Sequence, residues 1–447
     1  METVRGRFGA PDPKQEDFMN KLAEDLNRTL ENTSAAALLS DYGKRLYVPK
    51  GIIVQSAEAK QKAKKYNATI GIATEGGKPM YIKPIRDAFS AELTDSEIFP
   101  YAPMGGVAAL RAAWLEQMKL KNPLLAAKET SLPVVTSGLT SSISIVASLF
   151  LDKGDDVVMP DLYWENYNLI LTEQRQAKIN FYPFFSDKGG FNVEGLKAVL
   201  QGIKAPKAFV FLNFPNNPTG YAPTAAEADE IAAVLVEQAA KGKKIVVLCD
   251  DAYFGLFFDD KVFRQSMFAR LADAHENILA VKGDAATKEE MVWGFRVGFI
   301  TYGCKGYTAA QYDALVQKTM GALRGSLSSC SLPSQNAILK AFASPEYEQS
   351  KQQGIEKIRL RFEALKQELA KHASDDCLTP LPFNSGYFMA FGCRCDAEQL
   401  RQLLLNKYET GVIRLDDSHI RLAFSSIDLE KIPALVNTVY QAAAELS

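Results

Sequence analysis

Long apolar runs are missing from this chain of 447 residues. No stretch approaches the ~20 consecutive apolar residues that a membrane-spanning helix requires. The first residues, Met1–Arg5, lead into polar sequence and lack the apolar core of a secretion signal. These absences argue against a helical membrane protein, and we expect a cytoplasmic protein with no membrane partner.

A large charge of one sign is missing as well. The 51 lysines and arginines nearly balance the 53 aspartates and glutamates, which gives a formal net charge of −2. Because both signs are mixed along the chain, no basic surface for nucleic acid or for an anionic membrane is indicated. We therefore expect small-molecule partners and no nucleic acid.

Cysteine pairs with metal-binding spacing are also missing. Of the six cysteines only Cys393 and Cys395 lie close together, and no second pair accompanies them as in a zinc site. Scattered cysteines in a large chain are typical of reduced intracellular thiols. We favour that interpretation over a metal site, and we expect no metal.

From about residue 134 to 302 the sequence alternates apolar strand-like segments with helical stretches. One helix is expected to follow Thr224, which can serve as its N-cap. Near-continuous apolar strands that alternate with helices predict an α/β fold with a mainly parallel sheet covered on both faces. The expected strands are Val134–Thr136, Asp156–Met159, Ala208–Leu212, Lys244–Leu248, Asn277–Val281 and Val297–Tyr302.

The two ends of the chain have a different pattern. Residues 1–60 are polar and break at Pro49–Gly51, which predicts a peripheral arm. Beyond about residue 355 a long charged helix over Ile355–His372 is followed by short strands and a closing helix over Ile432–Leu446, which predicts a smaller α+β domain. The arm has apolar residues at helical spacing, namely Phe18, Leu22, Leu26 and Leu30.

Lys288 is the first candidate for chemistry. It follows the expected strand Asn277–Val281 and a turn of small residues, and open α/β sheets bind ligands outside the carboxyl ends of their strands. A lysine amine that loses its solvation there can become neutral enough to form a Schiff base. Arg296 follows eight residues later, between Gly294 and Gly298, and could bind an anion.

Three further segments at strand ends have both an ordinary and a functional interpretation. Asn213–Gly220 is rich in turn residues, and Asp250 or Asp251 could simply cap a helix. Thr136–Ser142 opens a helix, whose free N–H groups serve a plain cap or a phosphate equally well. An aromatic residue after a strand, Trp164 or Tyr163, can stack on a flat ligand or pack in the core.

Arg421 lies within an apolar strand near the C-terminus. Burying its charge without a partner would be costly, so the guanidinium requires a carboxylate. That carboxylate can belong to the protein or to a bound substrate, because the planar guanidinium binds carboxylates in bidentate fashion.

Taken in order, these segments resemble the class I and II aminotransferases, which use pyridoxal 5′-phosphate (PLP). Lys288 matches the pattern S-K-x-x-x-x-x-G-x-R-x-G, with Thr287 in place of the serine. Asn217 lies in an N-P-x-G motif, and Asp250 opens a D-x-A-Y motif. Trp164 begins a W-x-N-[HY] motif, which is similar to the aspartate and aromatic aminotransferase branch. The resemblance covers most of the chain, from about residue 67 to 424.

The resemblance implies PLP fold type I, with a large domain around a seven-stranded sheet and a smaller α+β domain. The implied limits are an arm over 1–60, the N-terminal part of the small domain and a linker over 61–95, the large domain over 96–354 and the C-terminal small domain over 355–447. It also implies a homodimer with shared active sites, because Tyr101 matches a tyrosine that reaches the phosphate of the neighbouring subunit.

The resemblance further implies a role for each site residue. The implied catalytic residues are Lys288, Asp250 and Tyr253. Asp250 would hold the proton of the pyridine nitrogen of PLP, and Tyr253 and Asn217 would hydrogen-bond to its phenolic oxygen. Ala285 stands where relatives often have a phosphate-binding serine, so one phosphate contact is missing. The other implied cofactor contacts are Gly138, Leu139, Thr140, Trp164, Arg296 and Tyr101. The implied substrate contacts are Arg421, Asn217, Gly71 and, for a distal carboxylate, Arg324.

The expected activity is a PLP-dependent transamination between an L-amino acid, aspartate or an aromatic one, and a 2-oxo acid such as 2-oxoglutarate. Two alternatives stay open, because the motifs bind PLP without selecting the reaction. One is a β-decarboxylase or carbon–sulfur lyase of the same fold. The other is a ligand-sensing domain without enzymatic activity, although the first 60 residues are too short and too evenly charged for the DNA-binding domain of such a regulator.

Overall fold

The computed structural model describes residues 19–31, 33, 38–47 and 51–446. The chain divides into two compact units, Met1–Lys50 and Gly51–Ser447. In the first unit, helix α1 (Lys21–Thr29) begins after Asn20, whose side chain accepts a hydrogen bond from the Leu22 N–H, and α3 (Asp41–Arg45) follows. Phe18, Pro49 and Lys50, which supported the predicted arm, lie outside the described residues.

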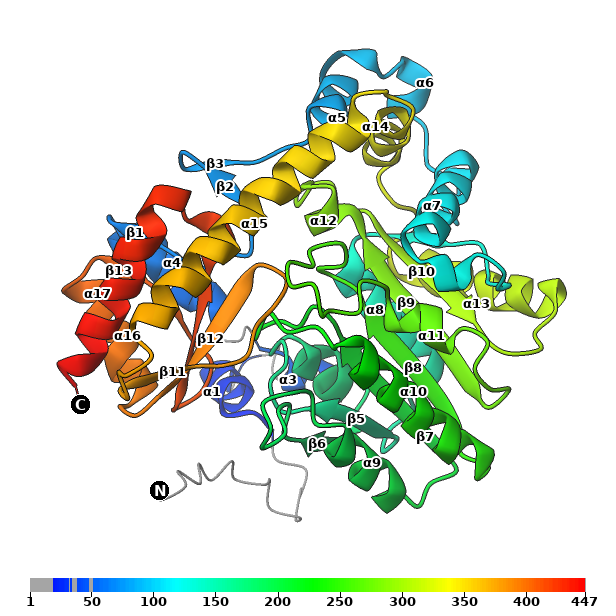
Figure 1. Ribbon diagram of the computed structural model, residues 1–447. Helices are drawn as coiled ribbons and strands as arrows, with labels where there is room; N and C mark the ends of the chain where they lie inside the picture. Colours follow the sequence, from blue (N-terminus) through cyan, green and yellow to red (C-terminus); the bar gives the residue numbers. More distant parts are fainter. Residues whose placement is uncertain (1–18, 32, 34–37, 48–50, 447) are drawn as a thin grey trace. The chain divides into compact units, whose positions relative to one another are not determined.

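The second unit contains a seven-stranded sheet with the strand order β4-β10-β9-β8-β7-β5-β6 (Figure 1). Its strands are parallel except that β10 runs antiparallel to both of its neighbours, β4 and β9. The predicted mainly parallel sheet is thus confirmed, and only the edge strand β6 was not predicted. The strands are β4 (Val134–Thr136), β5 (Asp156–Pro160), β6 (Lys178–Tyr182), β7 (Lys207–Asn213), β8 (Lys244–Asp250), β9 (Ile278–Ala285) and β10 (Gly298–Gly303).

Both faces of this sheet are buried, as the apolar strands predict. Along β7, Phe209 and Phe211 face one core, and Val210 and Leu212 face the other. Helix α8 packs on the first face, and α9, α10 and α11 pack on the second. The helices of this part are α5 (Lys83–Asp87), α6 (Asp95–Ile98), α7 (Ala108–Lys121), α8 (Leu139–Phe150), α9 (Val193–Gly202), α10 (Ala225–Ala240), α11 (Met267–Leu271), α12 (Ala286–Glu289), α13 (Ala309–Ser326) and α14 (Leu332–Phe342).

A smaller, antiparallel sheet has the order β11-β12-β15-β14. The long helix α15 runs from the side of the large sheet to this smaller sheet, where it lies beside α17 (Figure 1). The elements of this part are α4 (Ile52–Lys62), β1 (Tyr66–Asn67), β2 (Thr74–Glu75), β3 (Lys78–Pro79), α15 (Tyr347–Lys371), β11 (Leu378–Pro380), β12 (Phe388–Cys393), α16 (Ala397–Asn406), β13 (Thr410–Gly411), β14 (Ile413–Arg414), β15 (His419–Ala423) and α17 (Ile432–Ala444).

Segments from both ends of the second unit meet at the smaller sheet. β1 pairs in parallel with β13, and the Ala423 N–H at the end of β15 donates to the Ala68 carbonyl. Helix α4 packs against β13 and β14, so the chain enters this part of the fold from about residue 52. Among the described residues, none of the helices combines the length and apolar character that crossing a bilayer requires.

Candidate active site

A cavity of about 260 Å³ lies where the carboxyl ends of β7, β8 and β9 meet β12 and β15. It brings together residues that are far apart in the sequence, from Ile52 to Arg421. Ten predicted site residues line it, namely Gly71, Leu139, Thr140, Trp164, Asn217, Asp250, Tyr253, Lys288, Arg296 and Arg421. The other lining residues are Ile52, Tyr167, Asn213, Ala252, Thr287 and Phe388.

Lys288 enters the cavity from the short helix α12, directly after β9 ends at Ala285. Its Nζ lies 4.8 Å from the centroid of the Tyr253 ring. Desolvation lowers the pKa of Lys288 from its ordinary value of 10.5 to about 8; the Asp250 carboxylate opposes this change and the Arg296 charge adds to it. The amine is therefore neutral at a much lower pH than an exposed lysine, as a nucleophile requires.

Asp250 is the last residue of β8 and is 2% exposed. Its carboxylate accepts hydrogen bonds from the Tyr167 hydroxyl, at 2.5 Å, and from the Ala252 N–H, at 3.0 Å. Burial raises the pKa of Asp250, and these hydrogen bonds oppose the increase. The neighbouring Asp251 does not line the cavity, because its side chain is paired with Lys282 at 2.5 Å. Of the two aspartates that the sequence left open, Asp250 is the one at the cavity.

Arg421, on β15, is 2% exposed. Its Nη1 donates to Asn217 Oδ1 and its Nη2 to the Thr69 carbonyl, each at 2.9 Å, while its Nε has no hydrogen-bond partner. The guanidinium lies 4.1 Å from the centroid of the Phe388 ring. Among the ion pairs of the described residues none involves Arg421, and burial lowers its pKa to about 10. The carboxylate that the sequence requires is thus not supplied by the described part of the protein.

The opposite end of the cavity is built to hold an anion. Gly138 is the N-cap of α8 with φ +80°, so the N–H groups of Leu139 and Thr140 begin the helix without intrahelical acceptors. A Cβ on Gly138 would lie 2.4 Å from Nη2 of Arg296, so only glycine lets the guanidinium reach the helix start. Free N–H groups, the positive end of the helix and an arginine together suit a phosphate. Thr287 adds a hydroxyl to the cavity wall, whereas Ala285 offers none.

The aromatic wall distinguishes the two residues that the sequence left as alternatives. Trp164 lines the cavity, whereas Tyr163 bonds to Asn168 and stacks on Phe181. Tyr167, which lines the cavity and bonds to Asp250, was not predicted, although it is the last residue of the W-x-N-[HY] motif.

Besides Gly138, which directly precedes the cavity residues Leu139 and Thr140, two predicted residues do not line this cavity. Tyr101 is 92% exposed, and Arg324 is exposed on α13 with its Nη1 bonded to Ser328 Oγ at 2.8 Å. Neither residue is among those that line the cavity of its own chain. Their roles stay predictions, and that of Tyr101 requires a second subunit.

Comparison with known proteins identifies the family. A family model described as aminotransferase class I and II matches residues 69–439. The chain belongs to this family. The family is PLP-dependent and consists of enzymes, so the predicted family and its cofactor are confirmed at this level.

This aminotransferase is only distantly similar in sequence to its curated relatives. It is 27% identical over 261 residues to a probable aspartate/prephenate aminotransferase of Aquifex aeolicus, a match that covers 56% of this chain and 60% of the relative. It is 25% identical over 321 residues to an aspartate aminotransferase of Bacillus sp. (strain YM-2), covering 71% and 73% of the two chains. The chain therefore spans between about half and three quarters of the length of such relatives.

Solved structures confirm PLP fold type I. An aminotransferase from Anaerococcus prevotii superimposes with a TM-score of 0.81 at 23% identity, covering 92% of this chain and 99% of that one. An aspartate aminotransferase from Thermus thermophilus with maleate gives 0.71 at 18% identity, covering 90% and 99%. At these identities the likeness establishes the fold.

The residues of the cavity fit PLP. The start of α8 and Arg296 offer donors for its phosphate, and the glycine at 138 leaves the space that a Cβ would fill. Asp250 offers a buried carboxylate for the pyridine nitrogen, and Lys288 offers an amine of lowered pKa for the aldehyde.

Replacing Gly138 by alanine tests the anion end. We expect Gly138→Ala to weaken PLP binding about 10- to 100-fold, because the Cβ displaces Arg296 from the helix start and a lost hydrogen bond to a charged group costs about 1.5–3 kcal/mol. The measurement is the PLP dissociation constant of the apoprotein by fluorescence titration. Gly154→Ala is the matched control: it has a similar φ of +83° but open space around a Cβ, so it should cost stability and leave PLP affinity unchanged. Equal PLP affinity in both variants would place the phosphate elsewhere.

The pKa of Lys288 predicts the pH dependence of PLP capture. Only the neutral amine attacks the aldehyde. Because its pKa is lowered to about 8, capture by the apoprotein should accelerate as the pH rises to about 8 and then level off. The measurement is the rate at which PLP becomes attached to Lys288 at each pH, with the product trapped by borohydride. A peptide of the same digest that carries an exposed lysine serves as the reference. A rate that still climbs steeply toward pH 10.5, the ordinary value, would show that Lys288 is solvated.

Proposed function

We propose that this protein is a PLP-dependent transaminase that moves the amino group of an L-amino acid, aspartate or an aromatic one, to a 2-oxo acid such as 2-oxoglutarate. The observation that carries the proposal is the buried Arg421, which has no acidic partner among the described residues and faces the same cavity as Lys288. A substrate carboxylate would supply the missing charge. The relatives named aspartate/prephenate and aspartate aminotransferase support the same substrate class.

In this proposal each cavity residue has one task. Arg421 binds the α-carboxylate, which turns the α-carbon toward Lys288. When bound, PLP draws electrons from the α-carbon of an attached amino acid. The Lys288 amine would accept the proton of the substrate α-carbon as general base and, as general acid, would donate it to the C4′ carbon of the cofactor rather than back to the α-carbon.

The other side chains hold the cofactor. Asp250, oriented by Tyr167, keeps a proton on the pyridine nitrogen. Asn217 uses its Oδ1 for Arg421, so its amide NH₂ remains to donate to the phenolic oxygen together with the Tyr253 hydroxyl. Burial raises the pKa of Tyr253, which keeps that hydroxyl protonated as a donor. Trp164 covers the ring, and Gly138, Leu139, Thr140 and Arg296 hold the phosphate. Gly71 is the proposed neighbour of the substrate carboxylate: it lines the cavity against Phe388, where a Cβ would lie 2.9 Å from the ring.

The proposal includes a cytoplasmic homodimer with shared active sites. Tyr101, 92% exposed, is free to reach the phosphate site of a partner, and Arg324 is the proposed contact of a distal carboxylate. Six free cysteines agree with a reducing compartment. The proposed parts of the chain remain the arm over 1–60, the segment over 61–95, the large domain over 96–354 and the small domain over 355–447.

The test is a half-reaction of the purified protein loaded with PLP. Glutamate, aspartate and phenylalanine are added separately, without oxo acid, and the visible absorption and the oxo acid formed are measured. Bleaching with an equal amount of the matching 2-oxo acid supports the transaminase and identifies the donor. Release of carbon dioxide, or of ammonia with a thiol, would instead establish the β-decarboxylase or carbon–sulfur lyase. Binding of an amino acid without any product would favour the ligand-sensing domain.

A further inference from the structure

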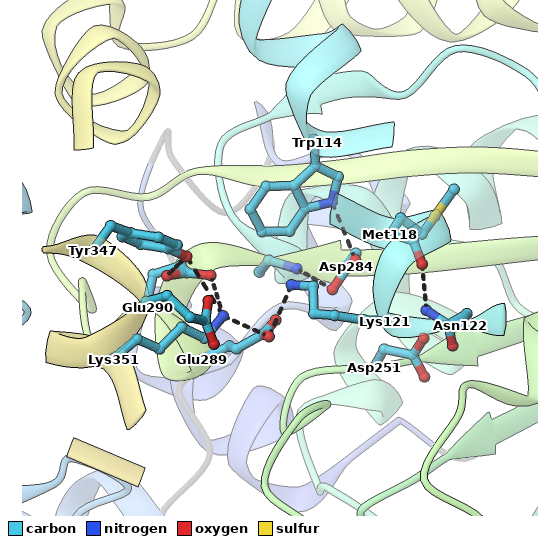
Figure 2. Close-up of polar contacts among 12 residues, drawn as sticks. Trp114, Met118, Lys121, Asn122, Asp251, Asp284, Glu289, Glu290, Tyr347 and Lys351 are labelled. Carbon is cyan, nitrogen blue, oxygen red and sulfur yellow. Dashed lines mark hydrogen bonds and ion pairs between the residues drawn. The ribbon is translucent and has the colours of Figure 1, made fainter. Parts of the chain in front are cut away.

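A buried cluster of charges lies directly behind the lysine of the candidate active site. Glu289 and Glu290 follow Lys288 in the sequence, and they are 3% and 0% exposed. Neither glutamate lines the cavity, and Figure 2 shows both beside Tyr347 and Lys351 of α15. We call this group the Lys351 cluster; its members are Lys121, Glu289, Glu290, Tyr347 and Lys351.

One cation joins both glutamates. Lys351 Nζ lies 2.7 Å from Glu289 Oε1 and 2.8 Å from Glu290 Oε1 (Figure 2). Lys121, from α7, also reaches Glu289 Oε1 at 2.8 Å, and the Tyr347 hydroxyl donates to Glu290 Oε2 at 2.5 Å. Burial alone would raise the pKa of Glu289, but the two lysines outweigh it and lower that pKa to about 2. Glu289 is therefore held in its charged form, and the cluster contains two lysines and two glutamates.

The segment that carries Lys288 is also bent tightly against α15. Met291 has φ +53°, a left-handed conformation that costs free energy for a residue other than glycine. Its side chain packs directly against Gly354 of α15. A Cβ on Gly354 would lie only 2.5 Å from Met291 Cε. The Tyr387 hydroxyl donates to the Lys288 carbonyl at 3.2 Å, so the segment is fixed from a second direction.

We propose that Lys351 is a positioning residue, which fixes α12 to α15 so that the Lys288 amine points into the cavity. Helix α12 has four residues, too few to hold a side-chain direction by itself. Two adjacent carboxylates repel each other when buried, and a single cation that contacts both sets their positions and hence the rotation of α12. Helix α15, with 25 residues, provides the rigid support. This inference rests on the proposed role of Lys288.

A purely structural role is the alternative. Buried ion pairs often add little net stability, and balanced removal of the charges can leave the fold intact. The two roles therefore separate in a variant that keeps the charge balance but loses the connection. Lys351→Met/Glu290→Gln leaves Lys121 and Glu289 as a pair. The new amide side chain at position 290 can still accept from the Tyr347 hydroxyl, but nothing joins α12 to α15 by charge.

The experiment uses the full-length apoprotein of four proteins: wild type, Lys351→Met, Lys351→Met/Glu290→Gln and the control Lys207→Met. The control removes an ion pair with Asp155 at 2.5 Å, at the start of β7 and opposite the strand end that borders the cavity. The measurements are the thermal midpoint, hydrogen exchange of the amides of residues 286–292, and the rate at which Lys288 captures PLP, trapped with borohydride and located by mass spectrometry.

We expect the double variant to melt near wild type, to exchange faster over residues 286–292 and to capture PLP about tenfold or more slowly, since small misplacements of a reacting group have effects of this size. Lys351→Met alone should show the same changes in exchange and capture, and its thermal midpoint should in addition be lower. Lys207→Met should match wild type in exchange and capture. A double variant with wild-type exchange and capture would reduce the cluster to a structural role and overturn the proposal. If the wild type itself does not capture PLP at Lys288, the proposed function fails, and the exchange data still decide whether Lys351 holds α12.

Discussion

Lys288→Ala is expected to abolish covalent attachment of PLP and to lower kcat by about 10⁴-fold or more, because the variant lacks both the attachment point and the general base. The Lys288 amine lines the same cavity as Arg421, and its pKa of about 8 is suited to a general base. Activity is measured as the half-reaction with the amino acid that bleaches the wild type. Attachment is measured by borohydride reduction and intact mass.

The same substitution should leave the fold intact. Lys288 forms no ion pair among the described residues, and burial without a partner makes its charged form costly. We therefore expect an unchanged or slightly higher thermal midpoint at pH values below about 8, where the wild-type amine is protonated in both the folded and unfolded states. Lys318→Ala, at an exposed position of α13, serves as the control for activity and mass. Retention of full transaminase activity by Lys288→Ala would refute its assignment.

The sequence predicted the large sheet well because both of its faces are buried. Segments such as Ala208–Leu212 are apolar at every position, which is typical of a parallel strand covered by helices on both sides. The edge strand β6, Lys178–Tyr182, alternates polar and apolar residues and was missed. Strands of two or three residues, such as β13 and β14, carry too few side chains for any periodicity to be visible.

The candidate site was predictable where one short motif places a functional side chain at a strand end. Asp250 is the last residue of an apolar strand, and Lys288 and Asn217 lie within four residues of the end of one, so the local sequence contains both the strand and the residue. Phe388 and the Lys351 cluster were not predicted, because their contacts join separate segments: Phe388 contacts Arg421 on another strand, and Lys351 lies 62 and 61 residues from Glu289 and Glu290. Lys351 lies in a charged helix, where the sequence pattern alone suggests a solvent-exposed face.

The absence of an acidic partner for Arg421 among the described residues leads to the second large effect. We expect Arg421→Met to lower kcat/KM by about 30- to 4000-fold, since a truncated partner in a buried, hydrogen-bonded charge pair costs about 2–5 kcal/mol. Most of the change should appear as a higher KM, because the guanidinium contacts the substrate carboxylate before and during the reaction. Steady-state kinetics with the identified donor provide the measurement.

Stability should respond very differently to the same substitution. In the ligand-free protein the Arg421 charge is desolvated without a counter-charge, so methionine removes that cost but leaves the Thr69 carbonyl and Asn217 without their donors. These opposing effects should keep the change in unfolding free energy within about 2 kcal/mol. Arg361→Met is the matched control, since Arg361 is a second buried arginine that donates to backbone carbonyls, those of Ser425 and Thr74, but it does not line the cavity. It should lose stability and little of kcat/KM. If instead Arg421→Met unfolds readily while its kcat/KM falls no more than that of Arg361→Met, then Arg421 serves the fold, and the substrate carboxylate must bind elsewhere.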